Sequence, residues 1–206
     1  MKTVLVLACF LIGLVSCKST MDEDAVVPME IPTNINSFQQ YTFDELNLAR
    51  TNPAQYAELR LKSDMENGED NGSYLYFKNL APLAALRFCN ALNLSASDYS
   101  LFLADKNLMG HNENGTPLKR ATIVGFEGSS IGENIAASSE DEYNSILNPQ
   151  KSAIAFVRIM IIDNGVADLS HRLTILNPKY KSVGIGFNRN PASTFVNYTV
   201  QDFGNQ

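Results

Sequence analysis

The segment from Gly110 to Arg172 contains three short motifs: Gly110-His111, Gly132-Glu133-Asn134-Ile135 and Ser170-His171-Arg172. The whole chain has only two histidines, and both lie in these motifs. Glu133 lies between them in a Gly-Glu-Asn sequence, which we interpret as a turn. Two imidazoles and a carboxylate from separate segments can share a site only if the fold brings them together. This segment therefore predicts a functional site together with the fold that would assemble it.

Supporting motifs lie on both sides of this segment. They are Asn47-x-x-Arg50-x-x-Pro53 upstream, Arg120 and Gly125 before Gly132, Ile175-Leu176-Asn177-Pro178 after Arg172, Val183-Gly184-Ile185-Gly186, and Val200-Gln201-Asp202-Phe203-Gly204. In this order the set resembles the CAP superfamily of cysteine-rich secretory proteins, antigen 5 and pathogenesis-related 1 proteins. It is most similar to the bacterial branch of SCP-domain proteins. The resemblance covers residues 41–204.

The resemblance implies an α/β fold, namely a single CAP-type α-β-α sandwich with a central, mainly antiparallel sheet. The predicted domain spans residues 41–206, and no internal repeat divides it. Composition alone indicates only one mixed α and β domain.

Local sequence patterns predict the helices. Thr42 and Glu45 form a capping box for a helix over 42–51, and Asn52-Pro53 starts a second helix that ends near residue 62. A loop should follow over 63–73. Leu92, Ala96, Tyr99 and Leu103 form one apolar stripe of a further helix. Asn148-Pro149 should cap an apolar, deeply buried helix, and residues 182–187 and 195–203 should form a β-hairpin.

The N-terminus predicts export. Lys2 precedes an apolar run from Val4 to Val15 that is too short for a membrane span of about 20 residues, as in a secretory signal. The run ends Leu14-Val15-Ser16-Cys17, which resembles a bacterial lipoprotein cleavage box. We therefore expect a signal peptide at 1–16, lipidation of Cys17 and a tether over 17–40. An ordinary signal peptide with an incidental cysteine, or an uncleaved anchor, remains an alternative.

Charge and cysteine content exclude several classes of protein. The formal net charge is −6, and no basic stripe is present, so a nucleic-acid partner is not expected. Of three cysteines, Cys9 would leave with the signal and Cys17 would carry lipid. Cys89 would then be unpaired, and the domain would fold without a disulfide, unlike the eukaryotic members of the superfamily.

The resemblance also implies a site. Members carry two histidines and two acidic residues in one cleft, and His111, Glu133 and His171 match three of these positions. Many members place the fourth, a glutamate, on the preceding helix, where this chain has Phe156. Asp163, eight residues before His171, is the candidate for the fourth position. Imidazole and carboxylate ligands suit Zn²⁺ or another divalent cation.

Structural roles compete with these assignments. Either histidine could be a hydrogen-bonded structural residue, and Glu133 could hold its loop through backbone amides. Asn134 would close the turn after Gly132. Arg172 would pair with a carboxylate, and Arg50 would form an ion pair in the core or at an interface.

These observations predict an exported lipoprotein of the bacterial outer membrane or cell surface. Its cleft would bind a divalent cation and serve as a binding or interaction module for a lipid, cell-envelope or host-surface ligand. The alternative is a metal-assisted hydrolase of peptide or cell-envelope material. We favour the binding module over an enzyme. The chain contains no His-Glu-x-x-His, and its Gly-x-Ser-x-Gly match, Gly128-Ser129-Ser130-Ile131-Gly132, lacks the strand-turn-helix context of a nucleophile elbow. A third possibility is a degenerate cleft, with loops making the contacts.

Overall fold

The computed structural model describes residues 35–206. The predicted signal peptide at 1–16, the lipidation site Cys17 and most of the predicted tether lie outside the described residues. Within the described part of the chain, no helix combines the length and apolar character needed to cross a membrane.

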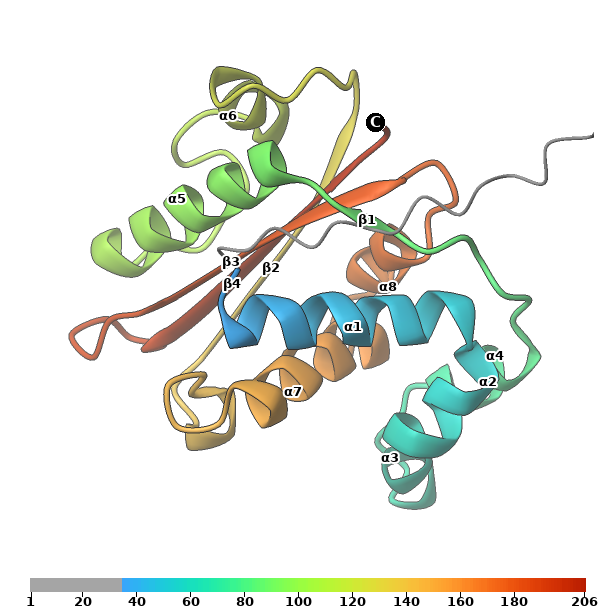
Figure 1. Ribbon diagram of the computed structural model, residues 1–206. Helices are drawn as coiled ribbons and strands as arrows, with labels where there is room; N and C mark the ends of the chain where they lie inside the picture. Colours follow the sequence, from blue (N-terminus) through green and yellow to red (C-terminus); the bar gives the residue numbers. More distant parts are fainter. Residues whose placement is uncertain (1–34) are drawn as a thin grey trace, which may run out of the picture.

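The elements follow one another in an order that begins with helices and ends with a hairpin (Figure 1). They are α1 (Ser37–Thr51), α2 (Pro53–Tyr56), the π-helical η1 (Ala57–Leu61), α3 (Lys62–Glu66), α4 (Ser73–Asn79), β1 (Arg87–Phe88), α5 (Asn90–Lys106), α6 (Pro117–Ile123), β2 (Ile131–Ser138), the 3-10 turn η2 (Asp141–Tyr143), α7 (Pro149–Ile162), α8 (Ser170–Ile175), β3 (Ser182–Arg189) and β4 (Asn197–Gly204).

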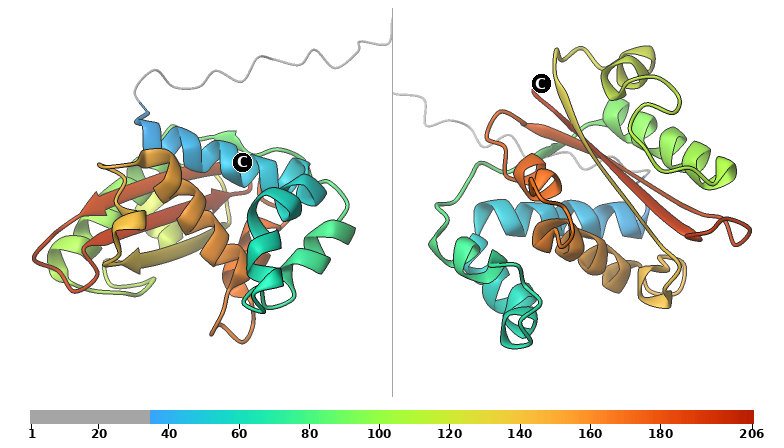
Figure 2. Two further views of the ribbon diagram at one scale, coloured as in Figure 1. Left: turned by 90° about the horizontal axis from the view of Figure 1, so that it is seen from below. Right: turned by 180° about the vertical axis from the view of Figure 1, so that it is seen from behind.

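The strands form one sheet in the order β1-β3-β4-β2. Strand β1 is parallel to β3, whereas β3 with β4 and β2 with β4 are antiparallel. Helices α5 and α6 lie on one side of the sheet, and α1, α7 and α8 lie on the other (Figures 1 and 2). The predicted α-β-α sandwich with a mainly antiparallel sheet is confirmed.

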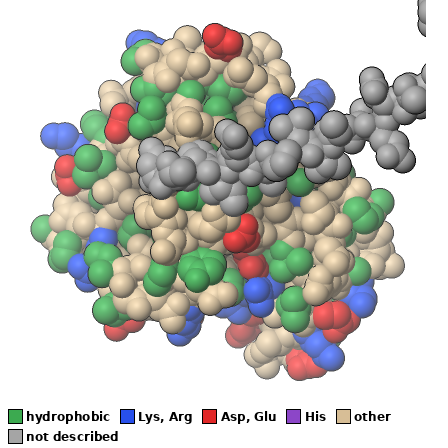
Figure 3. All heavy atoms as spheres, in the orientation of Figure 1, with side chains coloured by type: hydrophobic (Ala, Val, Ile, Leu, Met, Phe, Trp, Pro, Cys, Tyr) green, Lys and Arg blue, Asp and Glu red, His purple; other side chains and the backbone are tan. Residues whose placement is uncertain are grey.

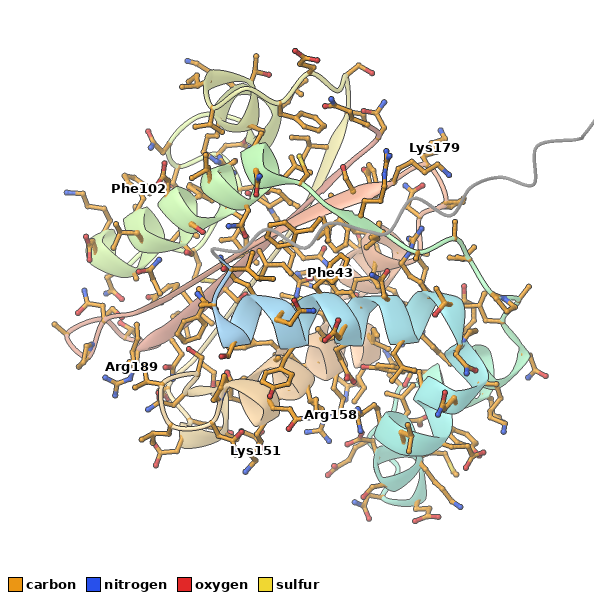
Figure 4. All side chains as sticks on the ribbon, viewed as in Figure 1. Phe43, Phe102, Lys151, Arg158, Lys179 and Arg189 are labelled. Atoms are coloured by element: carbon orange, nitrogen blue, oxygen red, sulfur yellow. The ribbon has the colours of Figure 1, made fainter. Side chains whose placement is uncertain are left out.

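Two apolar layers fill the space between the sheet and its helices. On the α1 and α7 side, Phe38, Phe156 and Phe187 form part of the main core, with ring centroids 4.7 to 6.2 Å apart. Phe43 points from α1 toward β1, where its ring lies 6.0 Å from that of Phe88 (Figure 4). The apolar stripe of α5, with its four predicted members all buried, packs against the opposite face.

The close contact between α5 and β3 depends on two glycines. A Cβ atom at Gly184 would lie 2.1 Å from the backbone of Leu92 and Asn93, and one at Gly186 would lie 2.0 Å from the carbonyl oxygen of Ala96. The backbone of α5 cannot move aside as a flexible side chain could. The Val-Gly-Ile-Gly sequence therefore alternates residues that fill the main core with residues that admit α5 on the other face.

We expect Gly184→Ala to lower the free energy of unfolding by about 1–3 kcal/mol or more, because the methyl group forces α5 away from the sheet. Chemical denaturation compares it with Gly125→Ala as a control for a glycine with open space around it. Gly125 has a φ of +94°, so that variant tests backbone strain without overpacking. A Gly184→Ala protein as stable as wild type would contradict this account of the interface.

Several predicted boundaries are wrong. Helix α1 begins at Ser37, since Asn36 and Gln39 form the capping box, while Thr42 is buried inside the helix. The helical segment after Pro53 continues to Glu66 instead of ending near residue 62. The Gly-Glu-Asn motif is not a turn but the start of strand β2.

Candidate functional site

The first half of the site is the pair of His111 and Glu133. His111 lies in the loop after α5 with a half-exposed side chain, whereas the carboxylate of Glu133, on β2, is almost fully buried. The His111 Nδ1 atom lies 2.9 Å from Glu133 Oε1. The buried carboxylate of Glu133 therefore orients the exposed imidazole of His111.

Arg120 holds this pair in place. Its guanidinium donates to the second oxygen of Glu133 and to the backbone oxygens of His111, at 2.9 Å, and Gly115. The same group lies over the ring of Tyr99, 3.4 Å from the centroid, in a cation–π contact. Arg120 thus fixes the loop 111–115 to strand β2 from its position on α6, and it is 8% exposed.

The second half of the site is the pair of His171 and Asp163. Asp163 ends α7 in the left-handed conformation, with a φ of +58°, which turns its carboxylate toward the first turn of α8. The carboxylate accepts hydrogen bonds from the backbone N–H groups of His171 and Arg172 and lies 2.7 Å from His171 Nδ1. The structure therefore brings together the histidine and the acid that we proposed for the fourth position.

Arg172 completes this junction from the other direction. Its side chain donates to the backbone oxygens of Ile161, at 2.5 Å, and Ile162, at 2.9 Å, which are carbonyls at the C-terminal end of α7. Burial lowers the pKa of its guanidinium. The prediction that Arg172 pairs with a carboxylate is wrong in this respect, because its hydrogen-bond partners are backbone carbonyls.

Strand β2 connects the two halves. Glu133 receives His111, and the next residue, Asn134, donates from Nδ2 to the backbone oxygen of His171 at 3.1 Å. Side chains of consecutive strand residues point to opposite faces of a sheet, so Glu133 faces α5 and Asn134 faces α8. Asn134 is therefore not a turn residue but the tie between β2 and the second histidine segment.

A second buried carboxyl lies beside Glu133. Asp202 is directly opposite it in the pairing of β2 with β4 and is fully buried. Ser95 Oγ donates to Asp202 Oδ2 at 2.7 Å, whereas Oδ1 has no hydrogen-bond partner among the described residues. Burial, and then the negative charge of Glu133, raise the pKa of the Asp202 carboxyl well above its usual range.

This pKa predicts how stability depends on pH. The folded protein keeps a proton on Asp202 at pH values where the unfolded chain, with a pKa of about 3.9, has lost it. This contribution to stability is complete below that value and declines as the pH rises toward the folded pKa. We expect Asp202→Asn, which cannot ionise, to gain stability relative to wild type between pH 4 and pH 7, by about 1.4 kcal/mol for each unit of pKa shift.

Urea denaturation at several pH values measures this difference. Asp98→Asn is the matched control, because Asp98 is exposed on the same side of the sheet. A constant difference between Asp202→Asn and wild type across the range would mean that Asp202 is ionised throughout.

The hydrogen bonds bear on how these residues could hold a cation. Both oxygens of Glu133 already have partners, His111 and Arg120, and the carboxylate of Asp163 accepts from three donors. Neither imidazole Nε2 atom takes part in a hydrogen bond between described residues. Among those residues, no group of three or more His, Cys, Asp or Glu side chains is arranged to hold a metal ion. Of these four side chains, only the two imidazoles keep a donor atom, Nε2, without a partner among the described residues.

Comparison with known proteins identifies the family. The model for "CAP: Cysteine-rich secretory protein family" matches residues 43–203. The chain belongs to the CAP family. The match confirms the resemblance derived from the ordered motifs and extends over nearly the same residues. A search of curated proteins finds no match.

Solved structures agree with the CAP fold. An extracellular SCP-domain protein from Bacillus anthracis has a TM-score of 0.52 and 20% identity, over 83% of this chain and 41% of that protein. BmVAL-1 has a TM-score of 0.52 and 15% identity, over 85% of this chain and 81% of its own. An outer surface protein from Borrelia burgdorferi has a TM-score of 0.45 and 20% identity, over 70% of this chain and 94% of that protein. This chain therefore spans less than half of the Bacillus protein.

Three site residues escaped prediction in their actual roles: Arg120, Ser95 and Asp202. Arg120 belonged to the motif set, but nothing in the sequence showed that it would contact both Glu133 and the His111 segment. Ser95 and Asp202 meet because β4 lies against α5, and only the strand register places Asp202 opposite Glu133.

Proposed function

We propose that this CAP protein is an exported lipoprotein whose domain is a binding module at the cell surface. The sequence of residues 1–17 supports export and lipidation at Cys17. Two of the similar structures are named as an extracellular and an outer surface protein. Several acyl chains on Cys17 would hold the domain at a membrane, since binding grows by about 0.8 kcal/mol per buried methylene.

The anchor is tested directly by mass spectrometry of the mature protein extracted with detergent. We expect a chain that begins at Cys17 and carries acyl groups. An unmodified Cys17 would contradict the lipoprotein assignment and leave an ordinary signal peptide or an uncleaved anchor.

We further propose that the module's cleft takes a divalent cation through Nε2 of His111 and Nε2 of His171. The supporting observation is that each imidazole places Nδ1 against a buried carboxylate, at 2.9 Å from Glu133 and 2.7 Å from Asp163. Histidines that bind metals almost always donate the other ring N–H to such an acceptor. The cation would fix the two histidine segments relative to each other and shape the surface that contacts a lipid, cell-envelope or host-surface ligand.

We expect Zn²⁺ to bind the full-length protein with about one ion per chain, and His111→Ala combined with His171→Ala to abolish binding. Glu133→Gln should weaken binding by about 10–100-fold, because it removes the charge that orients His111. Calorimetric titration measures each variant, with Glu113→Gln as the control for an exposed acid in the same loop. Equal binding by wild type and the double histidine variant would make the histidines structural.

One observation keeps the hydrolase as a second candidate. The His171–Asp163 pair is the arrangement that orients a general base. In the described part of the chain, however, no serine or cysteine side chain is hydrogen-bonded to either imidazole, and Ser129 Oγ instead accepts from Asn205. A hydrolase would therefore rely on activated water. A screen of peptide and cell-envelope substrates decides between the hydrolase and the binding module. In a hydrolase, loss of the general base His171 should lower turnover by about 10²–10⁴-fold.

A further inference from the structure

A pocket lies between α5 and α6, beside the loop that follows His111. It has a volume of about 300 Å³, at the small end for ligand sites. One wall is the face of α5 formed by Ser95, Asp98 and Tyr99, at helical positions i, i+3 and i+4. The other wall is α6 and its C-terminal end, and the loop 114–115 closes one side.

The α6 wall combines charge with apolar surface. Lys119 and Ile123 are separated by one helical turn, as are Arg120 and Val124. Ile123 is 75% exposed, although it is a large aliphatic side chain. Ile123 and Val124 give the pocket an apolar section beside its charged groups.

A buried donor in this wall has no acceptor. Arg120 lines the pocket and is 92% buried, given its exposure of 8%. Its two terminal nitrogens donate to His111, Gly115 and Glu133, but its buried Nε–H has no hydrogen-bond partner among the described residues. A buried polar group without a partner costs about 1–3 kcal/mol. The unsatisfied N–H adds to the positive potential of this wall, which favours a ligand carboxylate beside it.

Two further charges face the pocket without partners. Asp98 contributes a carboxylate from α5 and Lys119 an ammonium group from α6. Among the described residues, neither side chain forms a hydrogen bond or an ion pair. Charges of opposite sign therefore stand on opposite walls, with apolar surface beside them.

We propose that this pocket binds a free α-amino acid with an apolar side chain. Lys119 would receive the carboxylate, with the positive charge of Arg120 behind it, and Asp98 would receive the ammonium group. The side chain would lie against Ile123 and Val124. The guanidinium of Arg120 is already held by three acceptors and an aromatic ring, so little conformational freedom is lost on binding. The pocket shares Arg120 with the His111–Glu133 pair, so its ligand is tested with no cation bound.

The test is an NMR titration of the full-length, ¹⁵N-labelled protein in mild detergent with a metal chelator present. The probes are L-leucine, 4-methylpentanoate, which lacks the ammonium group, and isoamylamine, which lacks the carboxylate. We expect saturable shifts for L-leucine confined to α5 and residues 110–124. Each truncated probe should bind about tenfold more weakly, as expected for the loss of one charged contact.

Variants assign the contacts. Lys119→Met should weaken the binding of L-leucine and 4-methylpentanoate but leave that of isoamylamine unchanged. Asp98→Asn should weaken the binding of L-leucine and isoamylamine but leave that of 4-methylpentanoate unchanged. Lys151→Met is the matched control, because Lys151 is an exposed lysine on α7, on the far side of the sheet from α5 (Figure 4). Absence of saturable shifts with all three probes would overturn the proposal. Equal effects of Lys119→Met and Lys151→Met on L-leucine, or 4-methylpentanoate binding as tightly as L-leucine, would also overturn it.

Discussion

Arg50→Met should lower the free energy of unfolding by about 3–5 kcal/mol. Arg50 is fully buried and donates to the carbonyl oxygens of Ala84, Ile175, Asn177 and Tyr180, at 3.0, 2.6, 3.1 and 3.3 Å. These oxygens belong to two segments, one before β1 and one that runs from the last residue of α8 toward β3. A methionine fills similar space but leaves four buried acceptors without their donor.

The charge of Arg50 is compensated only by carbonyl dipoles. The prediction of an ion pair is wrong, since no carboxylate of a described residue lies within ion-pairing distance of it. Burial lowers the pKa of the guanidinium, but an arginine keeps its proton at any pH at which the protein would be studied. The loss of stability in Arg50→Met should therefore not depend on pH.

Chemical denaturation with two companion variants tests this role. Arg50→Lys should lose nearly as much as Arg50→Met, because one ammonium group cannot reach four acceptors spread over two segments. Arg87→Met, at an exposed arginine on β1, should change stability by less than about 0.5 kcal/mol. If Arg50→Lys retained wild-type stability, the positive charge would be sufficient, and the several N–H donors of the guanidinium would not be needed.

The parts of the fold that could be predicted have strong local signals. Helix α5 has an apolar stripe with a helical period, α7 has an Asn-Pro start, and β3 and β4 are apolar runs separated by a short polar loop. On the face of the domain seen in Figure 3, charged side chains of both signs are scattered among hydrophobic and other side chains. For these elements, short-range patterns and tertiary packing favour the same structure.

The errors occur where tertiary contacts override a local signal. Thr42 and Glu45 match a capping box, yet Glu45 is buried and pairs with Arg60 of η1 at 2.6 Å. Helix α1 therefore extends back to Asn36, and Thr42 lies within it. Likewise, Gly132-Glu133-Asn134 contains the residues of a turn, but pairing with β4 along eight residue pairs holds it as a strand.

The candidate site was predictable in its residues and not in its connections. The chain has only two histidines, and they pointed to the two segments that pair with Glu133 and Asp163. Asp163 was a candidate because it lies eight residues before His171 in the sequence. The pairing of each histidine with one buried carboxylate depends on long-range geometry. Glu133 and Asp202 are 69 residues apart, and only the sheet register makes them neighbours.

Glu133→Ala is expected to lower the free energy of unfolding by about 3 kcal/mol, because it leaves the buried guanidinium of Arg120 without its carboxylate. Removing one member of a buried ion pair typically costs about 3–5 kcal/mol. The lower end is expected here because Asp202 lies beside the vacated position. Once the charge of Glu133 is gone, the pKa of Asp202 should fall, and its carboxylate can then compensate Arg120.

This compensation predicts non-additivity. Combining Glu133→Ala with Asp202→Asn removes both possible counter-charges of Arg120. The double variant should therefore be less stable than the sum of the two single changes predicts, although Asp202→Asn alone should gain stability at this pH. Urea denaturation at pH 7 measures the cycle, with Glu113→Ala as the control for an exposed acid close in sequence. Strict additivity would mean that Asp202 cannot take over from Glu133. In that case burial alone would keep Asp202 protonated, and the neutral carboxyl would not compensate the charge of Arg120.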